Sequence, residues 1–147
     1  MANSAAGTDL GGTAEGFSRG MRSACQPERR SVLLIDDDPS VRTFFRMSLP
    51  LFGYQVDTVR SCRDARKKLA SRHYSTILLD LVLPDSSGIF FYYRLKARRP
   101  ELAAKVIFLT GAIERFPRLG ALRAEGRPVL LKPTRIREVL NAIRAIE

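Results

Sequence analysis

The chain has 147 residues, 45% of them hydrophobic, which is long and apolar enough for one domain with its own core. Its apolar runs fall short of the roughly 20 residues that a membrane-spanning helix needs, and its amino terminus lacks a secretory signal, so we expect a cytoplasmic protein without membrane contact. The net charge of +10 leaves two interpretations open: a surface for nucleic acid or an acidic protein partner, or an arginine-rich surface that is only solvated.

Along the chain, a polar segment precedes a regular alternation of short apolar runs and amphipathic stretches. Residues 1–30 are rich in Gly, Ala, Ser and Thr and show no sustained period, which predicts a disordered tail. The predicted strands are 32–36, 54–59, 76–80, 105–110 and 128–132, and the predicted helices are 39–51, 61–72, 87–98, 113–125 and 134–146. This alternation predicts an α/β fold over residues 31–147, a (βα)₅ doubly wound parallel sheet with helices on both faces.

Proline and capping residues suggest where several helices begin and end. Asp38 followed by a proline is typical of an N-cap and predicts the start of the first helix. Pro50 lies in the last turn of that helix and removes a backbone donor, so the helix should end early or bend there. Pro100 is expected to close the third helix, and Thr134 to open the last one.

Polar residues end four of the five predicted strands. Asp36 ends the first strand with Asp37 directly after it, and Asp80, Thr110 and Lys132 end the third, fourth and fifth. The carboxyl ends of parallel strands meet at one edge of a sheet, where ligands bind in such folds. Clustered carboxylates repel each other unless a cation compensates them, and hard oxygen ligands suit Mg²⁺.

These residue types together suit the transfer of a phosphoryl group to a carboxylate. A carboxylate can attack phosphorus and form an aspartyl phosphate, while a cation, an ammonium and a hydroxyl neutralise the phosphoryl oxygens. Two alternatives are isolated surface acids and metal-dependent hydrolysis. The sequence has no glycine-rich phosphate loop, and its single histidine, His73, is predicted late in a helix, away from the strand ends.

The segment from Ser31 to Ala145 resembles the receiver domain of two-component response regulators. The motifs that carry the resemblance are Asp36-Asp37-Asp38-Pro39, Asp80-Leu-Val-Leu-Pro84 with Gly88, Thr110-Gly111 and Lys132-Pro133. The resemblance implies a flavodoxin-like sheet with strand order 2-1-3-4-5. It also implies a Lys132–Pro133 bond in the cis form.

The resemblance further implies a role for each strand-end residue. Asp80 would accept phosphate from a histidine kinase or a histidine phosphotransfer protein, and Thr110 and Lys132 would contact the phosphoryl group. The residues implied to hold Mg²⁺ are Asp36, Asp37, Asp80 and, through its backbone carbonyl, Val82. Such a protein is a phosphoacceptor rather than a turnover enzyme on an external substrate, and as a single-domain regulator it would signal through contacts with a downstream protein.

The chain departs from the family three residues before the lysine. Receivers commonly carry Tyr or Phe there, an aromatic that swings inward with the threonine, whereas this chain has the β-branched Val129. The usual switch is therefore in doubt, and a phosphorylation-independent interaction module with a receiver fold stays open as an alternative. A Mg²⁺-dependent phosphatase with an aspartyl intermediate is a third hypothesis, but it would need additional chain for a cap or substrate domain.

Two surface features suggest how partners would be chosen. The third helix begins with five apolar or aromatic residues, of which Phe90 and Tyr93 should share the face away from the sheet, as scattered aromatics or as a partner patch. The basic residues are spread over several helices, and a helix-turn-helix would need chain beyond Glu147, so direct binding of nucleic acid is a minor hypothesis.

Cys25 and Cys62 have no metal or redox spacing and should be reduced thiols.

Overall fold

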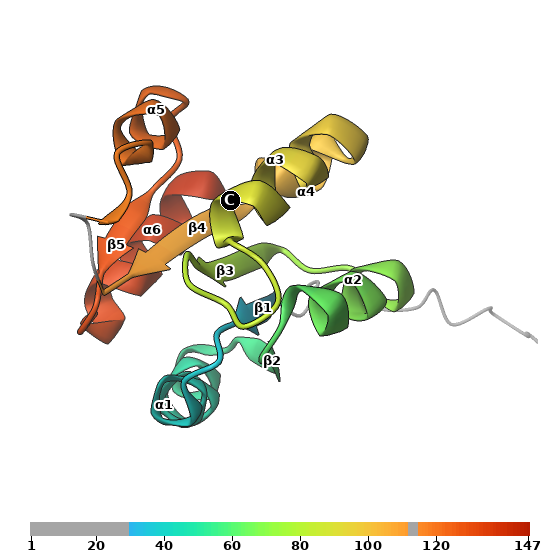
Figure 1. Cartoon of the computed structure of the whole chain (residues 1–147). Helices are drawn as coiled ribbons and strands as arrows, with labels where there is room; N and C mark the ends of the chain where they lie inside the picture. Colours follow the sequence, from blue (N-terminus) through green and yellow to red (C-terminus); the bar gives the residue numbers. More distant parts are fainter. Residues whose placement is uncertain (1–29, 112–114) are drawn as a thin grey trace, which may run out of the picture.

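A computed structural model describes residues 30–111 and 115–147, so all of the predicted tail over residues 1–30 except its last residue lies outside the described part. Five parallel strands form one sheet in the order β2-β1-β3-β4-β5, which confirms the predicted fold class and topology (Figure 1). The strands are β1 (Ser31–Ile35), β2 (Gln55–Val59), β3 (Thr76–Asp80), β4 (Val106–Thr110) and β5 (Val129–Leu131).

Helices cover both faces of the sheet, so the apolar central strands are buried on both sides. Every residue of β1, β3 and β4 is buried. Alternate residues of a strand point to opposite faces, so Leu33 joins one core cluster and Leu34 joins the other. The first cluster also contains residues of α2 (Cys62–Ser71), α3 (Gly88–Arg98), α4 (Pro100–Ala103) and α5 (Leu119–Ala124), and the second those of α1 (Pro39–Ser48), η1 (Leu49–Phe52) and α6 (Ile136–Ile146).

The start and the early end of the first helix follow the sequence signals. The Asp38 side chain accepts a hydrogen bond of 2.8 Å from the backbone N–H of Ser40, as an N-cap does. The α-helix ends at Ser48, and Pro50 lies within a 3₁₀ turn that closes at Gly53 with a positive φ of 85°. Glycine adopts this left-handed conformation without the steric cost that a side chain brings.

Two other helix starts differ from the predictions. Pro100 follows the end of α3 as expected, but it also begins the short helix α4, because proline fits the first position of a helix. The residue that precedes α6 is Arg135 rather than Thr134, whose hydroxyl donates to the carbonyl of Leu131 at 2.8 Å instead.

The fourth predicted helix, over 113–125, is shorter than expected. The helix α5 begins at Leu119, and residues 112–114 lie outside the described part of the chain. Pro117 is a boundary signal that the predicted range of 113–125 does not take into account, because proline disfavours helical backbone at the residue before it. Among the described helices, none is long and apolar enough to cross a membrane.

The edge strand β2 carries a carboxylate that is surrounded by donors and cations. Asp57 accepts a hydrogen bond of 2.6 Å from the hydroxyl of Tyr74 and pairs with Arg72 at 3.0 Å and Lys68 at 3.7 Å. Burial alone would raise the pKa of Asp57, but the hydrogen bond from Tyr74 and the two positive charges outweigh it and lower that pKa.

This lowered pKa predicts how the stability contributed by Asp57 depends on pH. Ionised Asp57 stabilises the folded state above the unfolded-state pKa of about 3.9, and the contribution is lost as the pH falls through the lower folded-state pKa. Asp57→Asn should therefore lower the free energy of unfolding by roughly 1–2 kcal/mol at pH 7, a difference that shrinks toward pH 2. Urea unfolding across this range measures it.

The matched control is Glu138→Gln, which neutralises an exposed carboxylate on α6 and should change the free energy of unfolding by less than about 0.5 kcal/mol. An Asp57→Asn effect that stays constant between pH 7 and pH 2 would contradict the assignment.

Candidate functional site

The polar strand ends meet at one edge of the sheet, as the sequence predicts. Asp36 follows β1, Asp80 ends β3, Thr110 ends β4 and Lys132 follows β5 (Figure 1). Asp36, Asp80 and Thr110 are almost completely buried. Parallel strands bring these residues together because all their carboxyl ends point the same way.

Three carboxylates form a cluster that could hold a metal ion. Asp36, Asp37 and Asp80 each offer an oxygen, and these oxygens lie within 4.8 Å of one another. Asp37 is exposed while the other two are buried, so the cluster is open to solvent on one side. Carboxylate oxygens with open positions fit Mg²⁺, which keeps several of its waters when it binds protein.

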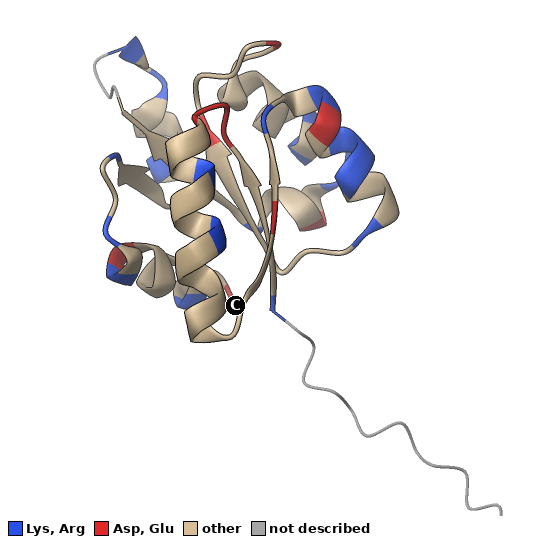
Figure 2. Cartoon of the chain, turned by 90° about the horizontal axis from the view of Figure 1, so that it is seen from below, with Lys and Arg blue, Asp and Glu red and all other residues tan. Residues whose placement is uncertain are grey.

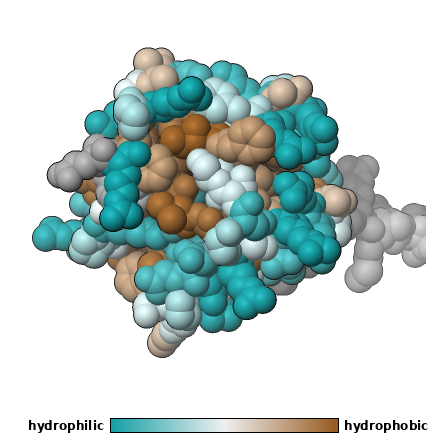
Figure 3. Space-filling model, in the orientation of Figure 1, coloured by the Kyte–Doolittle hydropathy of each residue, from teal (hydrophilic) through white to brown (hydrophobic). Residues whose placement is uncertain are grey.

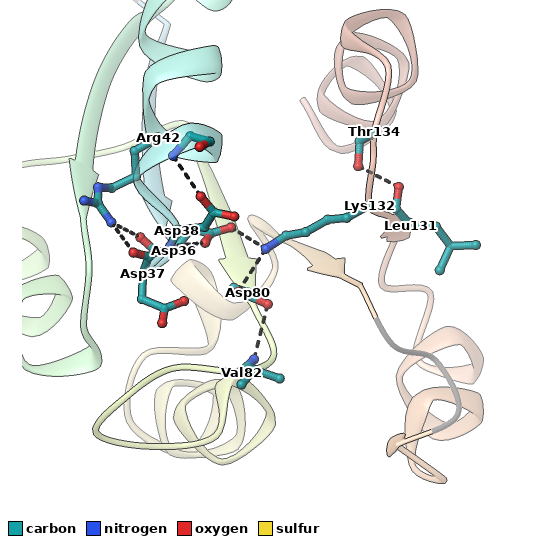
Figure 4. A network of polar contacts seen from close by, with 10 residues as sticks. Asp36, Asp37, Asp38, Arg42, Asp80, Val82, Leu131, Lys132 and Thr134 are labelled. Carbon is teal, nitrogen blue, oxygen red and sulfur yellow. Dashed lines mark hydrogen bonds and ion pairs between the residues drawn. The ribbon is translucent and has the colours of Figure 1, made fainter.

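Lys132 joins two of these carboxylates. Its ammonium donates to Asp36 at 2.6 Å and to Asp80 at 3.0 Å (Figure 4). Burial works to lower the pKa of Lys132, but the hydrogen bonds and charges of Asp36 and Asp80 outweigh it and raise that pKa, so the ammonium stays charged. Burial also raises the pKa of Asp36, although its hydrogen bond with Lys132 opposes that shift.

Arg42 holds the acidic loop in place, a role that the sequence analysis missed. Its guanidinium donates to the backbone carbonyls of Asp36 at 2.9 Å and Asp37 at 2.7 Å (Figure 4). The backbone N–H of Asp38 donates to the Asp36 carboxylate at 2.9 Å. An arginine in the first turns of a helix is too common a feature to have indicated these contacts from sequence.

The loop between β3 and α3 is anchored from two sides. Asp85 accepts hydrogen bonds from the backbone N–H groups of Cys62 at 3.0 Å and Arg63 at 2.9 Å, and so caps the start of α2. At the end of the loop, Gly88 lies against the backbone of Asp80, where a Cβ atom would approach the Asp80 carbonyl oxygen to 2.1 Å. Gly88 belongs to a motif that the sequence shows, whereas no sequence signal marks Asp85 as an anchor of this loop.

The remaining predicted site residues lie near the carboxylates. Val82 donates its backbone N–H to Asp80 at 3.2 Å (Figure 4), and the role of its carbonyl in metal binding stays a prediction. The backbone carbonyl of Thr110 accepts from the N–H of Lys132 at 2.8 Å. The Lys132–Pro133 bond is cis, as the resemblance implies, and Val129 is partly buried against the core on the α3 side.

The aromatic residues of α3 divide between the surface and a contact with α5. Phe90 is 58% exposed, and it lines a hollow with Tyr93 and Phe116. Tyr93 is only half-buried, and the hydroxyls of Tyr92 and Tyr93 donate to Glu125 at 3.0 Å and 3.4 Å. Figure 3 shows hydrophobic side chains near the middle of the face that Figure 1 presents. The use of Phe90 and Tyr93 by a partner stays a prediction.

Two residues that the sequence analysis set aside lie away from the site. His73 is exposed and follows α2, beside the first residue of β1, whose hydroxyl donates to the His73 carbonyl at 3.0 Å. It therefore lies at the opposite edge of the sheet from the carboxylates. Cys62 is a buried free thiol, and Cys25 lies outside the described residues.

Comparisons with known proteins agree on one family. The model of the response regulator receiver domain matches residues 32–144. The transcriptional regulatory proteins GltR of Pseudomonas aeruginosa and BasR of Escherichia coli are 31% and 30% identical over 117 and 115 residues, which cover 80% and 78% of this chain. The chain spans about half the length of these relatives, 48% and 51%.

Solved structures share the fold. A receiver domain from Methylobacillus flagellatus superimposes with a TM-score of 0.69 at 28% identity, covering 80% of this chain and 98% of that one. The response regulator TrrA from Thermotoga maritima, solved in complex with Mg²⁺ and BeF, gives a TM-score of 0.68 at 24% identity over 80% of this chain and 99% of that one.

The close approach of Gly88 to Asp80 predicts that this glycine is required for stability. In Gly88→Ala the new Cβ atom would meet backbone atoms, which cannot turn aside as a side chain can, so the free energy of unfolding should fall by about 1–3 kcal/mol. Denaturant unfolding measures this. Gly120→Ala is the control, since nothing lies within 4 Å of its added Cβ and alanine favours the helix α5. Equal stability of the wild type and Gly88→Ala would contradict the packing described.

Proposed function

The chain belongs to the response regulator receiver domain family, and on that premise we propose that Asp80 accepts a phosphoryl group in a Mg²⁺-dependent reaction. The donor is a phosphohistidine of a histidine kinase or of a histidine phosphotransfer protein. In the transfer, a carboxylate oxygen of Asp80 forms a bond to phosphorus while the bond between phosphorus and the histidine nitrogen breaks. The histidine ring keeps the electron pair of the broken bond.

The observation that carries this proposal is the position of Lys132. Its ammonium already contacts Asp80 at 3.0 Å, so a positive charge stands beside the atom that would receive phosphorus. A preorganised charge stabilises the negative charge of a phosphoryl group without the cost of reorganisation at the moment of reaction. The contact from Lys132 to Asp36 keeps the ammonium at this place before the donor arrives.

The cluster of Asp36, Asp37 and Asp80 would hold the divalent cation. When bound, Mg²⁺ supplies positive charge to the phosphoryl oxygens. This chain's own residues prepare for it: Arg42 fixes the loop that carries Asp36 and Asp37 through their backbone carbonyls. The exposure of Asp37 leaves space for the waters that Mg²⁺ retains.

The same proposal includes the role of the protein in the cell. Asp80 is a phosphoacceptor that is consumed and regenerated, and the chain does not turn over an external substrate. Its partners are the phosphodonor protein and a downstream protein that it contacts directly. The phosphodonor is made inside the cell, so the proposal includes a cytoplasmic location.

Val129 favours a second candidate, an interaction module that does not respond to phosphorylation. Position 129 carries no ring that could move, and its neighbour in register, Phe108, is covered by the ring of Tyr92 at 5.1 Å. Tyr92 is itself held by Glu125. Partner affinity that is unchanged by beryllofluoride would favour this candidate, whereas a large change in affinity would exclude it.

The phosphoacceptor assignment predicts that Asp80→Asn abolishes labelling. An amide cannot act as the nucleophile, so incubation with a radiolabelled histidine kinase or with a small phosphodonor should give no hydroxylamine-sensitive phosphoprotein. Asp38→Asn is the matched control, because it also neutralises a carboxylate near the site, while asparagine caps a helix as well as aspartate. Labelling of Asp80→Asn at the wild-type level would refute the assignment.

The metal proposal predicts that Mg²⁺ stabilises the folded chain. A ligand that binds only the folded state at ten times its dissociation constant adds about 1.4 kcal/mol to the free energy of unfolding. Thermal unfolding with increasing MgCl₂ should therefore show a rising midpoint in the wild type and in Asp38→Asn, and little change in Asp37→Asn. A midpoint that rises equally in Asp37→Asn would show that the cation binds elsewhere.

A further inference from the structure

A groove between α2 and α3 lies apart from the phosphoacceptor site. Both helices cover the same face of the sheet (Figure 1), and the hollow between them has a volume of about 230 Å³. Its floor is apolar, formed by Leu69 of α2, Phe91 and Leu95 of α3 and Leu102 of α4. Residues Asp36, Asp80 and Lys132 are not among those that line it.

The rim of the groove is basic. Arg66, Arg94, Arg98 and Arg99 line it, and among the residues that the structure describes no acidic one does. Arg99 pairs with Glu101 at 3.0 Å, and Arg94 lies over the ring of Phe90. Within residues 30–111 and 115–147, Arg66 and Arg98 are exposed and form no salt bridge, although the charge of Arg66 helps to lower the pKa of Asp85. Figure 2 shows that α2 carries basic residues densely along its length.

The size and chemistry of the groove limit what it can bind. A volume of about 230 Å³ is below the roughly 300–1,000 Å³ of sites that enclose a whole small molecule, and it suits a few apolar side chains. Stacking of nucleic-acid bases needs exposed aromatic faces, whereas Phe91, the one aromatic on the floor, is 4% exposed. Apolar side chains flanked by acidic ones complement both the floor and the rim.

We propose that this groove binds an acidic amphipathic helix of a partner protein. Apolar side chains spaced at i, i+3, i+4 and i+7 would contact the floor near Leu69, Leu95 and Leu102, and flanking Asp and Glu would pair with the arginines. The net charge of +10 would speed the approach of such a partner. This inference does not depend on Asp80 being phosphorylated.

The test uses a labelled helical peptide with Leu at i, i+3, i+4 and i+7 and Glu at most other positions. Fluorescence anisotropy should show binding that weakens at least about tenfold in Arg94→Glu/Arg98→Glu. Arg137→Glu/Arg144→Glu on α6 changes the net charge equally at exposed positions, and it should weaken binding less than about twofold. If the first variant does not fold by circular dichroism, Arg66→Gln/Arg98→Gln carries the same expectation.

Two comparisons separate the groove from general attraction between opposite charges. A scrambled peptide of the same composition should bind at least about tenfold more weakly, because it cannot place its leucines on one side. Equal binding of both peptides, or equal loss in the two double variants, would overturn the proposal. Displacement of the peptide by a single-stranded oligonucleotide at lower concentration than by unlabelled peptide would also overturn it, in favour of nucleic acid.

Discussion

The ammonium of Lys132 lies between the carboxylates of Asp36 and Asp80, two buried acids that would repel each other without it. This contact joins the end of β5 to the ends of β1 and β3, since Asp36 and Asp80 precede Lys132 by 96 and 52 residues in the chain. Removing one partner of a buried ion pair leaves an uncompensated charge, which is far more costly than the pair itself is stabilising. The three strand ends are therefore coupled through one ammonium group, and a ligand at this edge of the sheet is exposed to the positive charge of Lys132.

The loops around the carboxylates are held by backbone contacts that leave the site little freedom. Arg42 binds the carbonyls of Asp36 and Asp37, and Asp85 ties the following loop to the start of α2. Gly88 packs directly on the Asp80 backbone. A charge added at Asp80 would thus be felt by α1, α2 and α3 through fixed contacts, because packed elements transmit strain rather than absorb it.

Val129 affects how a change at Asp80 could be transmitted to the protein surface. The space beside β4 is filled by Tyr92, whose ring contacts the ring of Phe108 edge to face and whose hydroxyl donates to Glu125 at the end of α5. A rearrangement there would have to move α3 against α5, since position 129 has no ring to turn. The groove between α2 and α3 lies on the other side of α3 from the contact between Tyr92 and Glu125. A partner in that groove would therefore also contact α3.

The sequence by itself determined the alternation of strands and helices along the chain and the polar side chains that lie at the strand ends. Apolar runs that end in Asp80 and Thr110 specify buried parallel strands, and the carboxyl ends of such strands must share one edge. The run before Lys132 forms the edge strand β5, which is only partly buried. Only the tertiary structure decided the contacts of Arg42 and Asp85, the late start of α5 and the groove beside α3. Hydrophobic periodicity and helix caps depend on residues that are close in the sequence, so they can be recognised there. The contacts, the start of α5 and the groove depend on how distant elements pack, which short-range patterns do not encode.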